Sequence, residues 1–303
     1  MFEALNVACL GNVTLDHLLF VSSLPALDEV SLVTKKAECL GGRGAIVALV
    51  LAALNVPVSL VTVVGSRFER DWFKFLQEQG VTIEGVVIET SEETTSEVYI
   101  AIGEQEQNTV SFFLPKNLSF SPTATQQQIV SGAPILYLTT HNYNFNSKLL
   151  SNVDPSHKTI VFNFSSHMLS EVEYVNNLLN LSRVLICNAS DWRSLQQHSV
   201  TNSAAQLLAR HENLKALVIT HGKEGVTVHL PGDQVQIPVI SGPVLVPTGL
   251  GDAFSAGVVY ALARGQSIVA GAQLGVALAA ESASSPYSYP VLEHLKDRVG
   301  AFL

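Results

Sequence analysis

Hydrophobic residues follow two patterns along the chain. Short apolar runs rich in Val and Ile alternate with segments whose apolar residues recur at helical spacing, which is typical of strands buried on both faces and separated by helices. The predicted strands are residues 7–11, 58–64, 135–138, 159–162, 184–187 and 216–220. The predicted helices are residues 44–54, 69–79, 123–130, 170–179, 203–210, 252–264 and 268–283. This order predicts an α/β fold with one mostly parallel sheet and helices on both faces.

Two segments, residues 19–39 and 94–114, have a different pattern, in which apolar and polar residues alternate. Within the second segment, residues 96–102 and 109–113 are joined by a polar stretch, which predicts a hairpin with one apolar face. We therefore expect residues 19–39 and 94–114 to form a small β lid over the carboxyl edge of the main sheet, where open α/β folds bind ligands. The large α/β domain would then comprise residues 1–18, 40–93 and 115–303.

The composition is that of a globular protein. Of the 303 residues, 47% are hydrophobic and only 14% are charged, a balance far from that of disordered chains. The formal net charge is -9, so no overall positive field attracts a polyanion, and we expect no nucleic-acid partner.

The cysteines and the apolar stretches bear on the compartment. Three widely separated cysteines, Cys9, Cys39 and Cys187, fit reduced thiols in a core better than a disulfide framework. The uncharged stretch at residues 45–64 is interrupted by polar residues and a proline, so it predicts a buried helix, a turn and a strand rather than a membrane span. We expect a cytoplasmic protein that does not associate with membranes.

The first glycine cluster, residues 41–46 (Gly-Gly-Arg-Gly-Ala-Ile), only superficially resembles a dinucleotide-binding loop. The G-x-G-x-x-G pattern fails at its third glycine, which is Val47, and no acidic residue follows at the distance needed to hold a ribose. The single Gly-Lys pair, at residues 222–223, lacks the rest of a phosphate-binding P-loop. Neither nucleotide motif is present.

The second glycine cluster runs directly into a predicted helix. Around Gly249, Leu250 and Gly251, backbone N–H groups at the start of the helix would converge on one point and favour an anion, such as a transferring phosphoryl group. The carboxylate of Asp252 would repel that anion, so its presence here indicates a function. The function that fits is to accept a proton from an attacking hydroxyl. The alternative is that Asp252 is an ordinary N-cap and the glycines only form the turn.

With these motifs, the sequence resembles the ribokinase/PfkB family of carbohydrate and nucleoside kinases. Residues 248–252 are similar to that family's catalytic Asp-Thr-x-Gly-Ala-Gly-Asp element. The other similar segments follow in the family's order, at residues 11–16, 41–45, 65–81, 188–191 and 218–226. The short adenosine-kinase type with a ribokinase-like lid is the most similar subgroup. The resemblance implies a ribokinase-like three-layer sandwich whose large domain binds a nucleotide.

The resemblance also implies roles for individual residues. Asp252 would be the base and Gly249, Leu250 and Gly251 the anion hole. The acceptor would be bound by Asn12, Asp16, Gly41, Gly42, Arg43 and Asn163. The nucleotide would be bound by Asn188, Thr220, Gly222, Gly225 and Thr248. Asp191, where the family has Glu, would hold Mg²⁺ through water.

Simpler structural roles remain open for several of these residues. Asp16 follows a predicted strand and could be a turn residue rather than an acceptor of two hydroxyl hydrogen bonds. Arg43 could be solvated at the surface instead of binding a phosphate. Asn163 could satisfy a turn at a strand end, and Asn188 could be a helix N-cap.

The implied function is that of an ATP- and Mg²⁺-dependent kinase. It would phosphorylate a primary hydroxyl of a nucleoside, with adenosine the first candidate, or of a sugar. The alternatives are a ribokinase- or fructokinase-like sugar kinase and a weakly active sensor of nucleotides or metabolites with the same fold. The expected partner is a small-molecule acceptor, and the protein would be a monomer or a homodimer formed through the lid.

Two departures from the family's pattern bear on substrate and ion. Ile46 replaces the Asn that usually contacts the sugar, so that hydrogen bond should be missing. Val246 replaces an Asp that helps many members to hold a monovalent cation, although backbone carbonyls could still contribute.

Potassium ions should therefore have little effect on turnover. The measurement compares initial rates in potassium and in a bulky ammonium salt at equal ionic strength. A strong activation that saturates with potassium concentration would show that backbone carbonyls alone can build a cation site.

Overall fold

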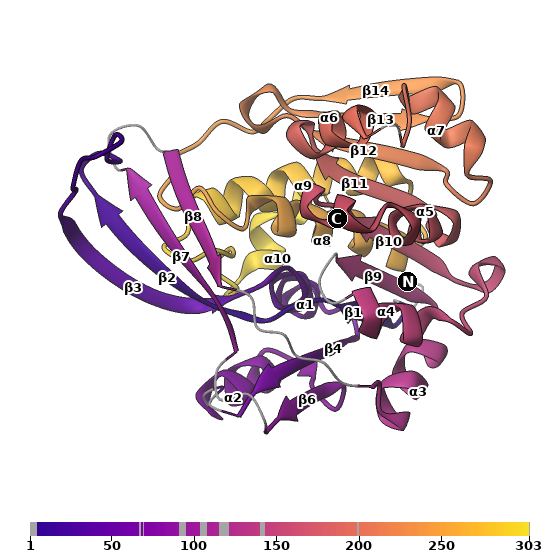
Figure 1. The fold of residues 1–303 in the computed structure, drawn as a ribbon, viewed down its shortest axis with the longest axis horizontal. Helices are drawn as coiled ribbons and strands as arrows, with labels where there is room; N and C mark the ends of the chain where they lie inside the picture. The colour runs from indigo at the N-terminus through magenta and orange to yellow at the C-terminus, as the bar shows by residue number, and fades with distance from the viewer. Residues whose placement is uncertain are drawn as a thin grey trace.

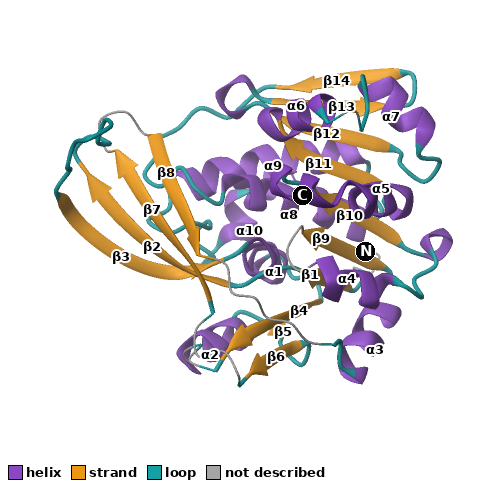
Figure 2. Cartoon of the chain, in the orientation of Figure 1, coloured by secondary structure: helices purple, strands orange, loops and turns teal. Residues whose placement is uncertain are grey.

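A computed structural model describes residues 5–66, 68, 70–90, 95–103, 108–114, 121–139, 143–198 and 200–302. The main body has three layers, a central sheet between two layers of helices (Figures 1 and 2). A second, smaller sheet projects from one side of this body. The turn predicted at residues 104–108 lies outside the described residues except for its last position.

Within the described part of the chain, the central sheet has ten strands. All six strands predicted from the sequence are present, and neighbours among them pair in parallel. From one edge to the other, the order is β14 (Asp233–Ile237), β13 (Val226–Leu230), β12 (Ala216–Thr220), β11 (Val184–Asn188), β10 (Thr159–Asn163), β9 (Ile135–Thr139), β1 (Val7–Leu10), β4 (Val58–Gly65) and β5 (Val81–Thr82), and β6 (Val86–Glu89) also pairs with β4. The sequence analysis missed β5, β6, β13 and β14, of which β13 and β14 form an antiparallel edge.

Helices cover both faces of the sheet, as predicted. One face packs against α1 (Arg43–Ala53), α2 (Arg70–Glu78), α8 (Leu250–Ala263) and α9 (Ile268–Ala283). The other packs against α3 (Ala124–Gly132), α4 (Tyr143–Leu150), α5 (Val172–Leu181), α6 (Ala189–Gln197) and α7 (Ala204–Arg210). A short helix, α10 (Leu295–Arg298), follows α9. Successive residues of β1 enter opposite cores, Val7 and Cys9 on the first face and Ala8 and Leu10 on the second.

Strand burial explains which predictions succeeded. The central strands are buried on both faces and read as continuous apolar runs, so the sequence pattern located them within one residue. Helices α4 and α6 were missed because each is short and largely polar, and only one side of each packs into the core. Within the described residues, no helix is long and apolar enough to cross a membrane.

The second sheet has four strands in the order β3 (Val33–Gly41), β2 (Thr14–Val21), β7 (Ser96–Gly103) and β8 (Asn108–Leu114). The predicted hairpin is present, with β7 and β8 paired antiparallel. Residues 14–18 and 40–41 differ from expectation, since they were assigned to the large domain but lie in this sheet. The reason is that β2 pairs along its whole length with β3 and β7 and, among the described strands, with none of the main sheet.

Helices α8 and α9 pack very closely where two glycines meet. A Cβ atom added at Gly257 would lie 2.4 Å from the backbone nitrogen of Gly275, and one added at Gly275 would lie 2.6 Å from the carbonyl oxygen of Phe254. The obstructing atoms belong to backbone, so no side-chain rotation relieves the overlap. Gly257 therefore permits close packing of the two helices.

The variant Gly257→Val should lower the free energy of unfolding by about 1 to 3 kcal/mol, the usual range for overpacking a core. Chemical denaturation of both proteins measures the difference. Gly132→Ala is the matched control, because a Cβ there meets no atom within 4 Å, and it should be neutral or slightly stabilising. An equal loss in both variants would contradict the packing argument.

Candidate active site

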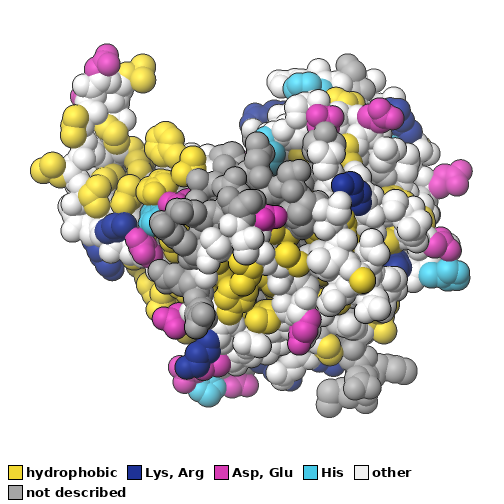
Figure 3. All heavy atoms as spheres, turned by 60° about the horizontal axis from the view of Figure 1, so that its bottom comes forward, with side chains coloured by type: hydrophobic (Ala, Val, Ile, Leu, Met, Phe, Trp, Pro, Cys, Tyr) yellow, Lys and Arg dark blue, Asp and Glu magenta, His cyan; other side chains and the backbone are white. Residues whose placement is uncertain are grey.

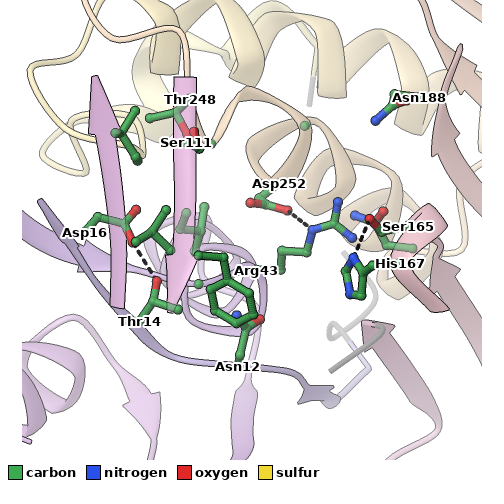
Figure 4. A pocket seen from close by; sticks show the side chains of 18 of the residues that line it. Asn12, Thr14, Asp16, Arg43, Ser111, Ser165, His167, Asn188, Thr248 and Asp252 are labelled. Atoms are coloured by element: carbon green, nitrogen blue, oxygen red, sulfur yellow. Dashed lines mark hydrogen bonds and ion pairs between the residues drawn. The ribbon is translucent and has the colours of Figure 1, made fainter. Parts of the chain in front are cut away.

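A cavity of about 510 Å³ lies between the second sheet and the carboxyl edge of the main sheet (Figure 4). It collects predicted site residues from distant parts of the chain. These are Asn12, Asp16, Gly42, Arg43, Asn163, Asn188, Thr220, Thr248, Gly249, Gly251 and Asp252. Ile46, expected to face the acceptor, also lines it. Five other predicted site residues are described by the structure but do not line this cavity, namely Gly41, Asp191, Gly222, Gly225 and Leu250.

The start of α8 provides the anion-binding geometry. Gly249 is the N-cap, with a left-handed backbone (φ 73°), and no side chain caps the helix. A Cβ at Gly249 would lie 1.7 Å from the carbonyl oxygen of Ser288, so glycine is required here. The first intrahelical hydrogen bonds run from the amides of Asp252 and Ala253 to the Gly249 carbonyl (3.1 and 3.0 Å). The amides before them precede the helical ladder, and the helix dipole favours an anion at this point.

Asp252 lies in the first turn of α8 and is not its N-cap, so the simple capping alternative is wrong. Its side chain is 14% exposed, at the wall of the cavity. Its pKa is raised to about 6, chiefly by burial; the Arg43 guanidinium lowers it and the charge of Asp16 raises it. A carboxylate with such a pKa is ionised at neutral pH and remains basic enough to accept a proton.

Arg43 is a cation inside the cavity and not a solvated surface residue. Its Nε lies 3.9 Å from Asp252 Oδ1, and its side chain is 30% exposed. Its Nη1 is buried and has no hydrogen-bond partner among the described residues. Figure 4 shows the guanidinium between Asp252 and the pair Ser165 and His167. An unpartnered guanidinium nitrogen can bind a phosphate or another anion here.

Asp16 lies within β2 and not in a turn, so the simpler reading of this residue is wrong. It is 5% exposed and accepts hydrogen bonds from Thr14 Oγ1 to Oδ1 (2.6 Å) and from Ser288 Oγ to Oδ2 (3.2 Å). Burial raises its pKa, and the two hydrogen bonds lower it. A Cβ at Gly41 would lie 2.1 to 2.2 Å from this carboxyl group, which explains the glycine without any contact to substrate.

The turn into α1 brings backbone close to the cavity. Gly42 has φ 94°, and a Cβ there would lie 2.5 Å from the Asn12 carbonyl oxygen. That oxygen accepts a hydrogen bond from the Gly44 amide (3.2 Å). The Gly-Gly-Arg-Gly segment therefore makes a tight turn that places Arg43 and the Asn12 side chain at the cavity.

Asn163 connects the end of β10 to α8. Its Nδ2 donates to Tyr137 Oη (2.8 Å) and to Ser255 Oγ (3.1 Å), and Ser255 Oγ donates to the Gly251 carbonyl (2.7 Å). Both bonds use the amide nitrogen, and they link Asn163 to side chains of β9 and α8 rather than to a turn of its own strand. Its contact with an acceptor remains a prediction.

Asn188 is the N-cap of α6, so the simpler reading is confirmed for this residue. Its Oδ1 accepts from the Asp191 amide (2.8 Å), and its Nδ2 donates to Asp191 Oδ2 (2.7 Å). Asp191 Oδ1 accepts from the Ser166 amide (2.8 Å). Both carboxylate oxygens of Asp191 are thus engaged within the protein, although Asn188 still lines the cavity.

The donor set for Mg²⁺ is sparse. Among the described residues, no group of three or more His, Cys, Asp and Glu side chains could hold a metal ion. Mg²⁺ commonly uses one or two carboxylates, waters and substrate phosphates, and a contact of the ion with Asp191 through water remains a prediction.

Thr220, at the end of β12, lines the cavity, whereas Gly222 and Gly225 shape the turn that follows it. Both glycines have positive φ, and a Cβ at Gly225 would lie 2.3 Å from the Ile237 carbonyl oxygen. Their role in nucleotide binding remains a prediction.

Several lining residues were not predicted. They are Thr14, Val98, Ile100, Ser111, Phe113, Ser165, His167, Ile186 and Cys187. The alternation in residues 96–102 and 109–113 does place Val98 with Ile100, and Ser111 with Phe113, on one face. Only the packing of the second sheet shows that this face looks into the cavity. No sequence signal pointed to Ser165 or His167.

A buried carboxylate beside a glycine-rich helix start is the arrangement that a phosphotransferase acting on a hydroxyl group needs, a base for the hydroxyl and an anion site for the phosphoryl group. The comparison with protein families makes this specific. The model of the pfkB family carbohydrate kinases matches residues 4–295, so the chain belongs to this family.

Similar proteins include both nucleoside and sugar-phosphate kinases. A nucleoside kinase of Methanothermobacter thermautotrophicus is 24% identical over 277 residues, covering 88% of this chain and 86% of that protein. An ATP-dependent ribose-1-phosphate kinase of Halopiger xanaduensis is 24% identical over 257 residues, covering 83% of each. The crystal structure of the Methanocaldococcus jannaschii nucleoside kinase superposes with a TM-score of 0.82 at 20% identity, covering 99% of this chain and all of that one. These findings support an ATP-dependent nucleoside or sugar kinase with a ribokinase-like fold.

The pH dependence should report the ionisation of Asp252. Because only the carboxylate form can accept a proton, kcat/KM should fall as the pH decreases through about 6, not through the ordinary value of 3.8. In Arg43→Gln this acid limb of the pH profile should move to higher pH, because the cation that favours the carboxylate form of Asp252 is lost. Arg43→Lys keeps a positive charge, so its acid limb should stay close to that of the wild type. Initial rates between pH 4.5 and about 8 measure the limb. A limb that stays in place in Arg43→Gln would contradict the assignment.

Proposed function

We propose that this protein transfers the γ-phosphate of ATP to the primary hydroxyl of a nucleoside, with adenosine as the first acceptor to test. The observation that carries the proposal is the placement of Asp16 and Asp252 in one cavity to which the second sheet contributes the apolar side chains of Val98, Ile100 and Phe113. Asp16, an acceptor-only group when ionised, suits the hydroxyls of a ribose ring.

The apolar wall supports a nucleoside over a free sugar. Val98, Ile100 and Phe113 from the second sheet, with Ile46 from α1, face the same cavity as Asp16. A planar base can bury its faces against such a surface, whereas a free sugar would leave hydroxyl groups unpaired there, at about 1 to 3 kcal/mol each. The absent Asn at position 46 fits an acceptor that is less polar at this point.

The mechanism follows from the positions of the charged groups. Asp252 accepts the proton of the attacking hydroxyl, while the amides at Gly249, Leu250 and Gly251 stabilise charge on the phosphoryl oxygens. Arg43 contributes a further positive charge beside Asp252. Thr248, Asn188, Thr220, Gly222 and Gly225 form the nucleotide side. When bound, Mg²⁺ would neutralise phosphate charge, with Asp191 in contact through water.

The second sheet acts in this proposal as a lid. Its inner face covers the acceptor side of the cavity, where exclusion of water would limit hydrolysis of ATP. The lid also carries exposed apolar side chains, among them Leu27, Val30 and Leu32 (96%, 91% and 82% exposed), and Figure 3 shows hydrophobic atoms gathered on it. A second copy of the chain could cover them in a homodimer formed through the lid. The alternative is a monomer, and light scattering at micromolar concentration distinguishes the two.

A ribokinase-like sugar kinase is the second candidate. Asn12, Ser165 and His167 line the cavity and give part of it a polar character that a sugar or sugar phosphate would use. The third possibility, a sensor with little turnover, is disfavoured by an intact anion hole and a carboxylate of suitable pKa beside it.

Asp252→Asn should lower turnover by about 10² to 10⁴ while leaving ATP binding intact, because the amide cannot accept the proton. A screen of nucleosides and sugars by coupled detection of ADP first identifies the best acceptor, and calorimetry measures ATP binding. Asp233→Asn, the same substitution at an exposed strand position, is the control and should match the wild type. Wild-type turnover in Asp252→Asn would refute the base assignment, and a failure of every acceptor in the screen would refute the kinase proposal.

A further inference from the structure

The segment after α9 passes between the second sheet and the start of α8, and one of its residues touches both. Ser288 is fully buried. Its Oγ donates a hydrogen bond to Asp16 Oδ2 (3.2 Å) and lies 3.3 Å from Cys39 Sγ. Since a serine hydroxyl has one proton and a carboxylate only accepts, the Cys39 thiol is the donor to Ser288 in this arrangement.

The backbone of the same residue contacts the anion hole. The carbonyl oxygen of Ser288 occupies the position where a side chain on Gly249 would be, 1.7 Å from an added Cβ. Any displacement of Ser288 therefore changes the space available to the first residue of the anion hole.

The two hydrogen bonds on Asp16 differ in origin. Thr14 belongs to the same strand as Asp16 and moves with it. Cys39, on the neighbouring strand, is the direct partner of Asp16 in the sheet. Ser288 instead follows α9 in the main body. Its hydroxyl contacts Asp16 on β2 and its backbone contacts Gly249 at the start of α8, so the residue connects the second sheet to that helix.

We propose that Ser288 is a positioning residue that holds the Asp16 carboxylate for the acceptor and couples the seating of the second sheet to the anion hole. The inference rests on the proposed function, in which Asp16 binds hydroxyl groups of the acceptor. Each Asp16 oxygen retains a lone pair for an acceptor hydroxyl after its bond to Thr14 or Ser288 is made. The acceptor and Ser288 therefore bind the carboxylate together and do not compete.

Ser288→Ala removes the hydroxyl and leaves the backbone contact with Gly249 in place. The KM for the acceptor should rise about tenfold, the usual scale for a hydrogen bond to a charged group, while the KM for ATP stays within about twofold. The hydrogen bond lowers the pKa of Asp16, so its loss should also move the acid limb of acceptor binding to higher pH. Ser288→Cys keeps a weak donor on a somewhat larger side chain, and it should give an intermediate KM.

Ser285→Ala is the matched control in the same segment. Ser285 is equally buried, but its Oγ accepts from the Tyr287 amide (3.2 Å) instead of donating to Asp16. This variant should leave the acceptor KM and the acid limb unchanged, even where thermal unfolding shows a loss of stability.

Three outcomes overturn the inference in different ways. If Ser288→Ala keeps the wild-type acceptor KM and acid limb while Asp16→Ala raises that KM, the proposed function stands and the role of Ser288 is wrong. If Ser288→Ala and Ser285→Ala raise both KM values alike, the role is structural only. If Asp16→Ala leaves acceptor binding unchanged, Asp16 does not bind the acceptor, and the inference is refuted together with that assignment.

Discussion

The ionisation of Asp252 at the buried start of α8 is the constraint around which the site is arranged. Burial and the neighbouring Asp16 favour the neutral form, and Arg43 favours the carboxylate, so the pKa settles at about 6. The folded state holds this proton more tightly than the unfolded chain does. The contribution of the group to stability is therefore present at low pH and is lost as the pH rises through about 6. At neutral pH the protein maintains a carboxylate that costs stability and suits proton transfer.

Close backbone approach is the second requirement of the site. Glycines at positions 41, 42 and 249 lie where a Cβ would overlap a carboxyl group or a carbonyl oxygen. The sequence analysis assigned Gly41 to acceptor binding, whereas in the structure the missing side chain of Gly41 leaves room for the Asp16 carboxyl group. Such a glycine acts on function through the geometry of its neighbour, which a motif alone does not reveal.

Much of the fold could be predicted because the strands of a doubly covered parallel sheet are apolar on both sides. This signal located β1, β4, β9, β10, β11 and β12. The antiparallel edge strands β13 and β14 lack this signal because polar residues alternate with apolar ones along them. Helices α4 and α6 were missed for a different reason, since each is half exposed and has a largely polar sequence. The sequence analysis also assigned residues 14–18 to the large domain, because the pairing partners of a strand are not encoded in its own pattern.

The sequence by itself determined the helix start at Gly249 to Asp252 and the strand ends at which Asn163, Asn188 and Thr220 lie. Each depends on local backbone chemistry, in which glycine permits a conformation and a following helix presents its amides. Only the tertiary structure decided that Asn188 caps α6 and engages Asp191, that Val98 and Phe113 line the same cavity as Asp252, and that Ser288 reaches Asp16. These relations join residues up to 272 positions apart, and they arise from how the two sheets and the segment after α9 pack together.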